Sequence, residues 1–108
     1  MNSEKLQQIA FELILSSGDA RTLVHEAFKK MREDQFNEAD EKINAANDSI
    51  VQAHKAQTGL LQSYANGDKI EMEILMVHAQ DHLMTTITLK EVAAELLLMY
   101  QKNFELVK

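Results

Sequence analysis

Apolar residues recur at intervals of three and four along almost the whole chain, a spacing typical of amphipathic helices. Between Ser3 and Met31 they form one such stripe, which Ser16-Ser17-Gly18-Asp19 interrupts. The stripe keeps its face across the interruption because Leu13 and Ala20 lie seven residues apart. We therefore expect one helix with Ser3 as its N-cap and a kink at the interruption.

The second apolar stripe begins after a turn near residues 33–35, where Asp34 is placed to cap the following helix. Its members are separated alternately by three and four residues: Phe36, Ala39, Ile43, Ala46, Ile50, Ala53, Gln57, Leu60 and Tyr64. This heptad seam predicts packing against another helix with left-handed crossing. Gly67 suits the left-handed conformation that ends a helix, so we expect the second helix to stop at Asn66-Gly67.

A third helix is expected from Asp68, where Glu71 completes a capping-box-like pair, to about Tyr100. The chain has no proline, only three glycines and no alternating strand pattern of useful length. Its 108 residues leave room for one domain, residues 1–108. Three long helices joined by short turns predict an all-α, antiparallel three-helix bundle.

The predicted third helix is apolar nearly all the way round its axis. One broad sector holds Ile74, Val77, Leu89, Val92, Leu96 and Met99, while Leu75, Leu83, Met84, Ile87, Leu97 and Leu98 fall elsewhere. A three-helix monomer needs only one apolar face on each helix, so we infer an oligomer with this helix at its centre. The alternative is a wide core-facing stripe inside a monomer.

Composition and charge exclude several classes of function. The net charge of −6 argues against a nucleic-acid binder and suits docking to a basic partner. The absence of cysteine excludes disulfides and thiolate metal sites. No apolar run reaches the roughly 20 residues of a membrane span, and no signal peptide follows Met1. We therefore expect a cytoplasmic protein without membrane insertion.

Five polar residues share one side of the apolar third helix: His78, Asp81, His82, Thr85 and Thr88. Asp81 lies on a heptad run, and if that seam faces a symmetry axis, each subunit contributes one carboxylate. A hard divalent cation such as Mg2+ would relieve the repulsion between them. The alternative is an Asp81 that faces water, which the spacing alone slightly favours.

The four histidines differ in what they suggest. His25 and His54 lie on ordinary helical stretches, and a structural role is expected for both. His78 and His82 are one turn apart and could share a metal ion, although Ala79 stands where a zinc protease has its glutamate. His78 could instead be a nucleophile that carries a phosphoryl group covalently. The pair could also be a polar layer that sets the register of the bundle.

Residues 77–84, VHAQDHLM, followed by Thr85-Thr86-Ile87, resemble the signature of the lactose/cellobiose-type IIA proteins of the phosphoenolpyruvate-dependent sugar phosphotransferase system. Two further segments are similar to that family: Ser17-Gly18-Asp19-Ala20-Arg21 and Ala53-His54-Lys55-Ala56-Gln57-Thr58. The likeness covers nearly the whole chain in order, and the His-Ala-Gln-Asp-His-Leu-Met run is its most specific part.

The resemblance implies a homotrimer of three-helix subunits, arranged as a nine-helix bundle. It also implies that His78 carries the phosphoryl group on Nε2, with His82 as a supporting neighbour. It implies that Asp81 meets its symmetry mates and binds one structural divalent metal per trimer, Mg2+. Members of the family take the phosphoryl group from HPr and give it to a cysteine of the IIB component.

The leading hypothesis is therefore a phosphocarrier, a phosphotransferase component that serves the uptake of a β-linked disaccharide such as cellobiose or lactose. General likeness favours cellobiose-like β-glucosides over lactose. The first alternative is a non-catalytic oligomeric helical interaction module, which forms trimers that never take phosphate. The second is a metal-binding bundle, which would lose its metal when His78 or His82 is changed.

Overall fold

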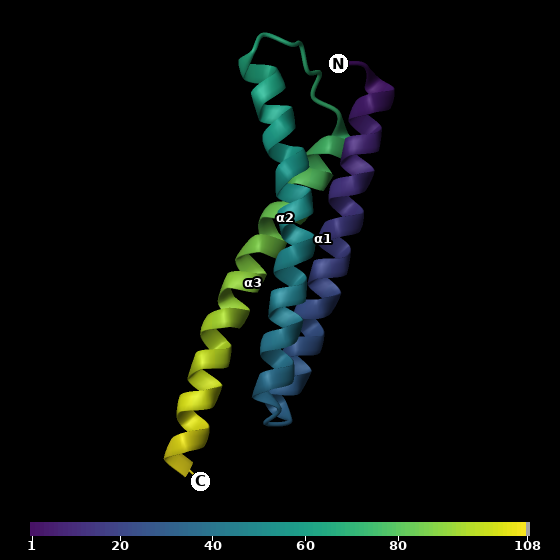
Figure 1. Ribbon diagram of the computed structural model, residues 1–108. Helices are drawn as coiled ribbons and strands as arrows, with labels where there is room; N and C mark the ends of the chain where they lie inside the picture. Colours follow the sequence, from purple (N-terminus) through teal and green to yellow (C-terminus); the bar gives the residue numbers. More distant parts are fainter. Residues whose placement is uncertain (108) are drawn as a thin grey trace.

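The computed structural model describes residues 1–107, which form the three helices α1 (Ser3–Arg32), α2 (Phe36–Ala65) and α3 (Ile74–Val107). They pack as an elongated bundle with extents of 58 × 20 × 18 Å, in which α2 runs antiparallel to α1 and α3 (Figure 1). The all-α three-helix prediction is confirmed. None of these helices combines the length and the apolar composition that crossing a membrane requires.

Helix α1 is a single helix from Ser3 to Arg32, so the prediction that one helix continues across residues 16–19 is confirmed, while the kink there stays a prediction. A glycine inside a helix costs only about 1 kcal/mol relative to alanine, and Ser17 and Ala20 both lie in the buried stripe. The predicted N-cap is displaced by one residue. The side chain of Asn2 accepts a hydrogen bond from the backbone N–H of Lys5 at 2.8 Å.

The two aspartates predicted to start helices instead lie where helices end. After α1, Asp34 adopts a left-handed conformation with φ 59°, and the N–H of Gln35 donates to the carbonyl of Lys30 at 2.9 Å. After α2, Gly67 has φ 99°, and the N–H of Asp68 donates to the carbonyl of Ser63 at 3.1 Å. Both are Schellman motifs, so Asp34 and Asp68 complete the preceding helix and cap no following one.

Residues 66–73 form a connection between α2 and α3, because α3 begins at Ile74 rather than at Asp68. The start of α1 contacts this connection at two points. The amino group of Met1 donates to the carbonyl of Lys69 at 3.2 Å, and the hydroxyl of Ser3 donates to the carboxylate of Glu73 at 3.0 Å. These contacts hold the segment extended beside α1 and delay the start of the third helix.

The core consists of two apolar clusters arranged end to end. One lies toward the α1–α2 turn and contains Ala20, Val24, Ala27, Met31, Ala39, Ile43, Ala46, Ile50, Ala93 and Leu97. The other lies toward the N-terminus and contains Leu6, Ala10, Leu13, Ala53, Leu60, Met76, Ala79 and Leu83. Between them, α1 and α3 contribute two fully buried polar residues, Ser17 and Thr86. A polar layer therefore divides the core at mid-height.

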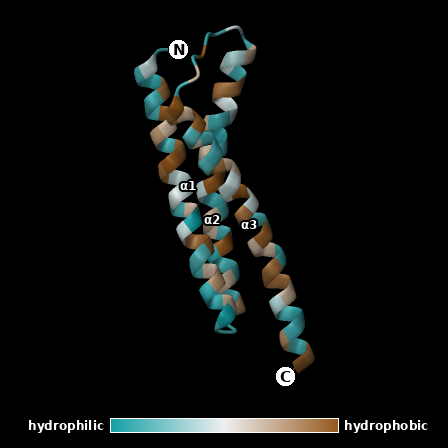
Figure 2. Ribbon diagram, turned by 180° about the vertical axis from the view of Figure 1, so that it is seen from behind, coloured by the Kyte–Doolittle hydropathy of each residue, from teal (hydrophilic) through white to brown (hydrophobic). Residues whose placement is uncertain are grey.

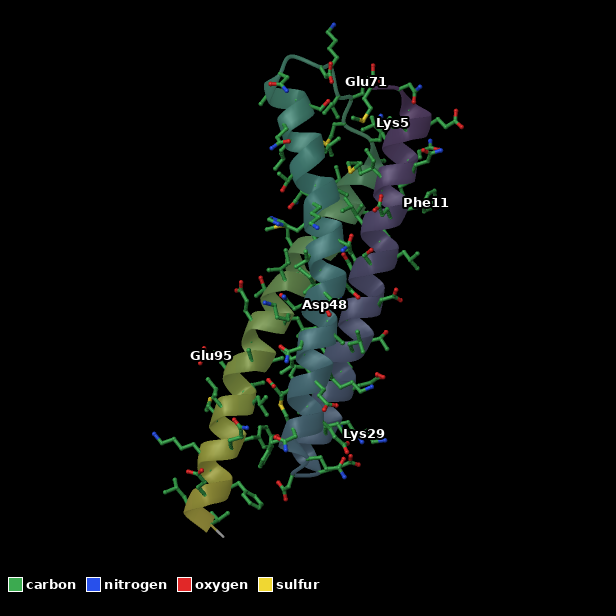
Figure 3. All side chains as sticks on the ribbon, in the orientation of Figure 1. Lys5, Phe11, Lys29, Asp48, Glu71 and Glu95 are labelled. Carbon is green, nitrogen blue, oxygen red and sulfur yellow. The ribbon has the colours of Figure 1, made fainter. Side chains whose placement is uncertain are left out.

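Helix α3 leaves much apolar surface uncovered. Its exposed large apolar side chains are Ile74, Val77, Met84, Val92, Leu98, Met99, Tyr100, Phe104, Leu106 and Val107. Its C-terminal half diverges from α1 and α2 and ends beyond their turn, with hydrophobic residues along its length (Figures 1 and 2). Phe11 of α1 likewise points away from the other helices (Figure 3). The single chain therefore leaves a large apolar surface on α3 uncovered.

Candidate functional site

The candidate site is a pair of imidazoles in the N-terminal third of α3. His78 and His82 lie one turn apart, with ring centroids 6.0 Å apart and planes inclined by only 13°, so the rings stack. His78 is exposed, whereas His82 is half-buried. The pair therefore has one ring open to solvent and a second ring that the bundle covers in part.

Helix α1 forms the wall behind His82. A Cβ atom at Gly18 would lie 4.0 Å from Nε2 of His82, so this edge of the ring faces the backbone of α1. One turn further along α1, Arg21 reaches across to α3. Its Nε donates to the hydroxyl of Thr86 at 3.2 Å, and one terminal nitrogen donates to Thr85 at 2.6 Å and to Thr86 at 3.0 Å.

The two threonines are themselves fixed to the backbone of α3. The hydroxyl of Thr86 donates to the carbonyl of His82 at 2.7 Å, and that of Thr85 donates to the carbonyl of Asp81 at 2.9 Å. Each hydroxyl has one proton, which these bonds use, so the lone pairs remain for Arg21. The network therefore ties α1 to the turn of α3 that follows the imidazole pair.

Burial lowers the pKa of His82 below its ordinary value, and the positive charges of Arg21 and His78 lower it further. The carboxylate of Asp81 acts in the opposite direction with a smaller effect. Desolvation and nearby cations both disfavour the imidazolium form. His82 therefore stays neutral to lower pH than a free histidine, which suits a neighbour that offers a lone pair or an N–H.

The other side of the signature segment is fixed by α2. The buried Gln57 donates from Nε2 to Oε1 of Gln80, and also to the sulfur of Met84 at 3.7 Å. Nε2 of Gln80 in turn donates to the sulfur of Met76 at 3.6 Å. Residues 76–86 are thus held from both sides by polar contacts, while His78 itself stays free.

Asp81 lies away from the bundle core, exposed on the outer face of α3 between Val77 and Met84. Within residues 1–107, no three side chains of the metal-ligating types His, Asp and Glu come together. Carboxylate oxygens suit a hard cation such as Mg2+. The residues therefore fit a metal only if more than one subunit contributes its Asp81.

The remaining histidines lie apart from this pair. His25 is exposed on α1 and packs edge-on against Phe28, with ring centroids 5.8 Å apart. His54 is exposed on α2. No contact of either ring within residues 1–107 suggests chemistry, so the structural role expected for them stays a prediction.

Sequence reasoning missed the two residues that hold the site, Arg21 and Gln57. Both lie in the two segments that resemble the family outside residues 77–87, and the resemblance assigns neither of them a role. The signal was present in the spacing: Arg21 follows the buried Ser17 by four residues, and Gln57 occupies a heptad position among buried Ala53 and Leu60. A polar residue at such a position needs a partner.

The sequence profile of the family "PTS system, Lactose/Cellobiose specific IIA subunit" matches residues 8–101. The chain belongs to this family. It is therefore a IIA phosphotransferase component of the sugar phosphotransferase system, as the signature around His78 suggested.

Relatives of this IIA component match over nearly their whole length. The lactose-specific EIIA component of Streptococcus mutans is 43% identical over 103 residues, which cover 95% of this chain and 99% of that protein. The crystal structure of PtcA from S. mutans is 59% identical, covers 94% of this chain and 99% of that chain, and has a TM-score of 0.93.

A third match is a chain in the solution structures of the IIA(Chitobiose)–HPr complex of the Escherichia coli phosphotransferase system. It is 31% identical and covers 90% of this chain and 94% of that chain, with TM-scores of 0.78 and 0.74 for two such structures. The same three-helix fold is therefore found in relatives named for different sugars, such as lactose and chitobiose.

Proposed function

We propose that His78 accepts a phosphoryl group from HPr and passes it to a cysteine of the IIB component during the uptake of a β-linked disaccharide. The observation that carries this proposal is the asymmetric imidazole pair. His78 is exposed and free of hydrogen bonds within residues 1–107, while its stacked neighbour His82 is half-buried against α1. An exposed nucleophile beside a partly covered second imidazole suits a carrier that must meet two proteins in turn.

The chemistry is a double displacement at phosphorus. Nε2 of neutral His78 attacks with its lone pair, the new N–P bond forms, and the N–P bond to the donor histidine of HPr breaks with its electron pair returning to that nitrogen. In the second step a cysteine thiolate of IIB attacks the same phosphorus, and the electron pair of the N–P bond returns to His78. Catalysis then rests on positioning and charge stabilisation.

HPr is proposed as the donor for two reasons. A structural relative of this chain is described in a complex with HPr, and HPr is the donor that the family likeness implies. The net charge of −6 suits attraction to a basic surface on a partner.

The sugar that we propose belongs to the class of β-linked disaccharides, and cellobiose-like substrates are favoured. We propose that the protein acts in the cytoplasm.

A homotrimer is the assembly that the exposed face of α3 supports. Ile74, Val77, Asp81, Met84, Thr88 and Val92 recur at heptad-like spacing on that face, and each is exposed in the single chain. Stacking three such stripes around one axis would give a nine-helix bundle with α3 at its centre. The three Asp81 carboxylates would then meet and hold one structural Mg2+ ion.

Labelling tests the proposal. The wild-type chain is incubated with phosphoenolpyruvate, enzyme I and HPr, beside the variants His78→Gln, His82→Gln and His54→Gln. We expect the wild type and His54→Gln to be labelled equally, His82→Gln to be labelled more slowly, and His78→Gln to stay unlabelled. An unlabelled wild type, or a labelled His78→Gln, contradicts the assignment. The first of these outcomes would favour the non-catalytic interaction module.

A further inference from the structure

Within residues 1–107, the guanidinium of Arg21 forms an ion pair with no carboxylate. The ion pairs within residues 1–107 involve Lys30 and Lys42, each with glutamates. Arg21 is half-buried and is bound only by the hydroxyls of Thr85 and Thr86. In a protein with 17 acidic residues, a half-buried cation without a counter-ion is unusual, because partly buried charges are usually paired.

The hydroxyl contacts fix Arg21 without neutralising it. They use Nε and one terminal nitrogen, and a guanidinium has five N–H donors on three nitrogens. The second terminal nitrogen forms no hydrogen bond within residues 1–107. Because both threonine hydroxyls give their protons to backbone carbonyls, they present only lone pairs to Arg21. The guanidinium is therefore held in one orientation. Its positive charge has no counter-ion within residues 1–107, and two of its five N–H groups remain free to donate.

The fixed charge lies close to the imidazole pair. Arg21 contacts Thr85 and Thr86, which follow His82 by one turn, and Gly18 of the same α1 segment faces the ring of His82. Thr85 and His78 are separated by seven residues, or about 10 Å along the helix. Arg21 can therefore act on a phosphoryl group at His78 only through a long-range attraction, over a distance comparable to the Debye length.

We infer that Arg21 is a positioning residue for phosphoryl transfer, which holds His82 against α1 and supplies the positive charge that favours the phosphoryl dianion at His78. This inference rests on the proposed function and deepens it by naming the group that stabilises the carried phosphate. Arginine suits the role because its planar guanidinium binds the hydroxyl oxygens of Thr85 and Thr86 at once. It also stays charged at any working pH. The segment Ser17-Gly18-Asp19-Ala20-Arg21 then serves the site from α1, opposite the signature on α3.

The kinetic test uses the full chain with Arg21→Gln, Arg21→Lys and the control Arg32→Gln. Arg32 is exposed on the same helix and forms no ion pair within residues 1–107. We expect Arg21→Gln to lower kcat for phosphorylation by HPr about tenfold with KM changed by less than about twofold, because the charge acts on the transferring group. Arg21→Lys should recover part of the loss, and Arg32→Gln should match the wild type.

A spectroscopic test needs no variant and so does not depend on its folding. Arg21 and Arg32 are the only arginines in the chain, so their Nε–H groups give two NMR signals. Phosphorylation of the wild-type chain should shift the Arg21 signal and leave the Arg32 signal in place. Two unmoved signals on a chain whose phosphorylation is verified by mass overturn the inference.

Three other outcomes separate the possibilities. A wild-type chain that takes no label overturns the proposed function and this inference together. A labelled wild type with an equally fast, folded Arg21→Gln overturns only the role of Arg21. Dissociation of the assembly in Arg21→Gln, measured by light scattering, also overturns it, because the guanidinium would then be an ion-pair partner between subunits.

Discussion

The α1–α2 hairpin and helix α3 use apolar residues in opposite ways. Every interior position of the α2 seam from Ala39 to Leu60 is buried within the chain. The hairpin is closed by a tight turn and by an ion pair between Nζ of Lys30 and Oε2 of Glu38, which are 2.9 Å apart. Helix α3 buries one face and exposes apolar side chains on others. The α2 seam is therefore covered within the single chain, whereas α3 contributes to both core clusters and still leaves apolar side chains uncovered.

The position of the polar residues differs in the same way. In the hairpin, Ser17 and Gln57 are the buried polar residues, and the other polar and charged side chains are exposed or, like Arg21, half-buried. In α3, polar residues interrupt the apolar faces within its N-terminal half, where Thr86 is fully buried and His82 is half-buried. Departures from simple amphipathic patterning are expected at functional sites, and in α3 the departure coincides with the candidate site.

The largest effect is expected from a charge on the exposed stripe of α3. Val92→Glu would place three unpaired carboxylates near the axis of the proposed trimer, at a cost of several kcal/mol each. Light scattering should show the 12.3 kDa mass of one chain. Leu61→Glu, on the exposed side of α2, is the matched control and should keep the assembly. Equal masses for Val92→Glu and the wild type would remove α3 from the interface.

A core truncation in the hairpin should come next. Leu13→Ala removes a fully buried side chain and should lower the free energy of unfolding by about 3 kcal/mol, because it leaves a cavity. Leu15 lies two residues further on the exposed side of the same helix, so Leu15→Ala should cost about 0.5 kcal/mol. Urea unfolding at equal chain concentration measures both. Similar losses for the two variants would contradict the division of α1 into a buried and an exposed face.

A smaller effect, in the stabilising direction, is expected at Asp81. Asp81→Leu should abolish metal binding and raise the stability of the trimer by about 1 kcal/mol or more, since the repulsion between carboxylates disappears. Elemental analysis and light scattering report the metal and the mass. Phosphorylation should persist, because the proposed metal holds the assembly and takes no part in the transfer. A monomeric Asp81→Leu would exclude the axial position.

The smallest effects on the free energy of unfolding are expected at two glycines, Gly59 inside α2 and Gly67 just after its end. Gly59→Ala should stabilise the chain by about 1 kcal/mol, because the helix gains propensity and an added Cβ meets nothing within 4 Å. Gly67→Ala should destabilise it by a similar amount, since φ is 99° there. Thermal unfolding distinguishes the signs. A shift of the same sign for both would contradict the Schellman motif at the end of α2.

Much of the fold followed from the sequence because it depends on local spacing. The α2 seam from Ala39 to Leu60 was predicted position by position, and Gly67 was identified as a helix terminator. The start of α3 was wrong because Asp68 serves the end of α2, and because Met1 and Ser3 hold residues 69–73 extended. Such contacts join residues about 70 positions apart, which no local pattern reports.

The candidate site was predicted only in part. His78 and His82 could be found because a four-residue spacing guarantees neighbours on one helix face. Arg21, Gly18 and Gln57 reach the site from other helices, so their roles depend on how the helices are aligned. The sequence marks them as unusual, but the partners that explain them become visible only in three dimensions.

The most direct measurement follows the phosphoryl group through the wild-type chain. After phosphorylation by HPr, 15N–31P NMR of the full chain should place the phosphorus on Nε2 of His78. Addition of IIB should then remove that signal while a phosphocysteine appears on IIB. Phosphorus on any other residue, or a signal at His78 that IIB leaves unchanged, would contradict the account.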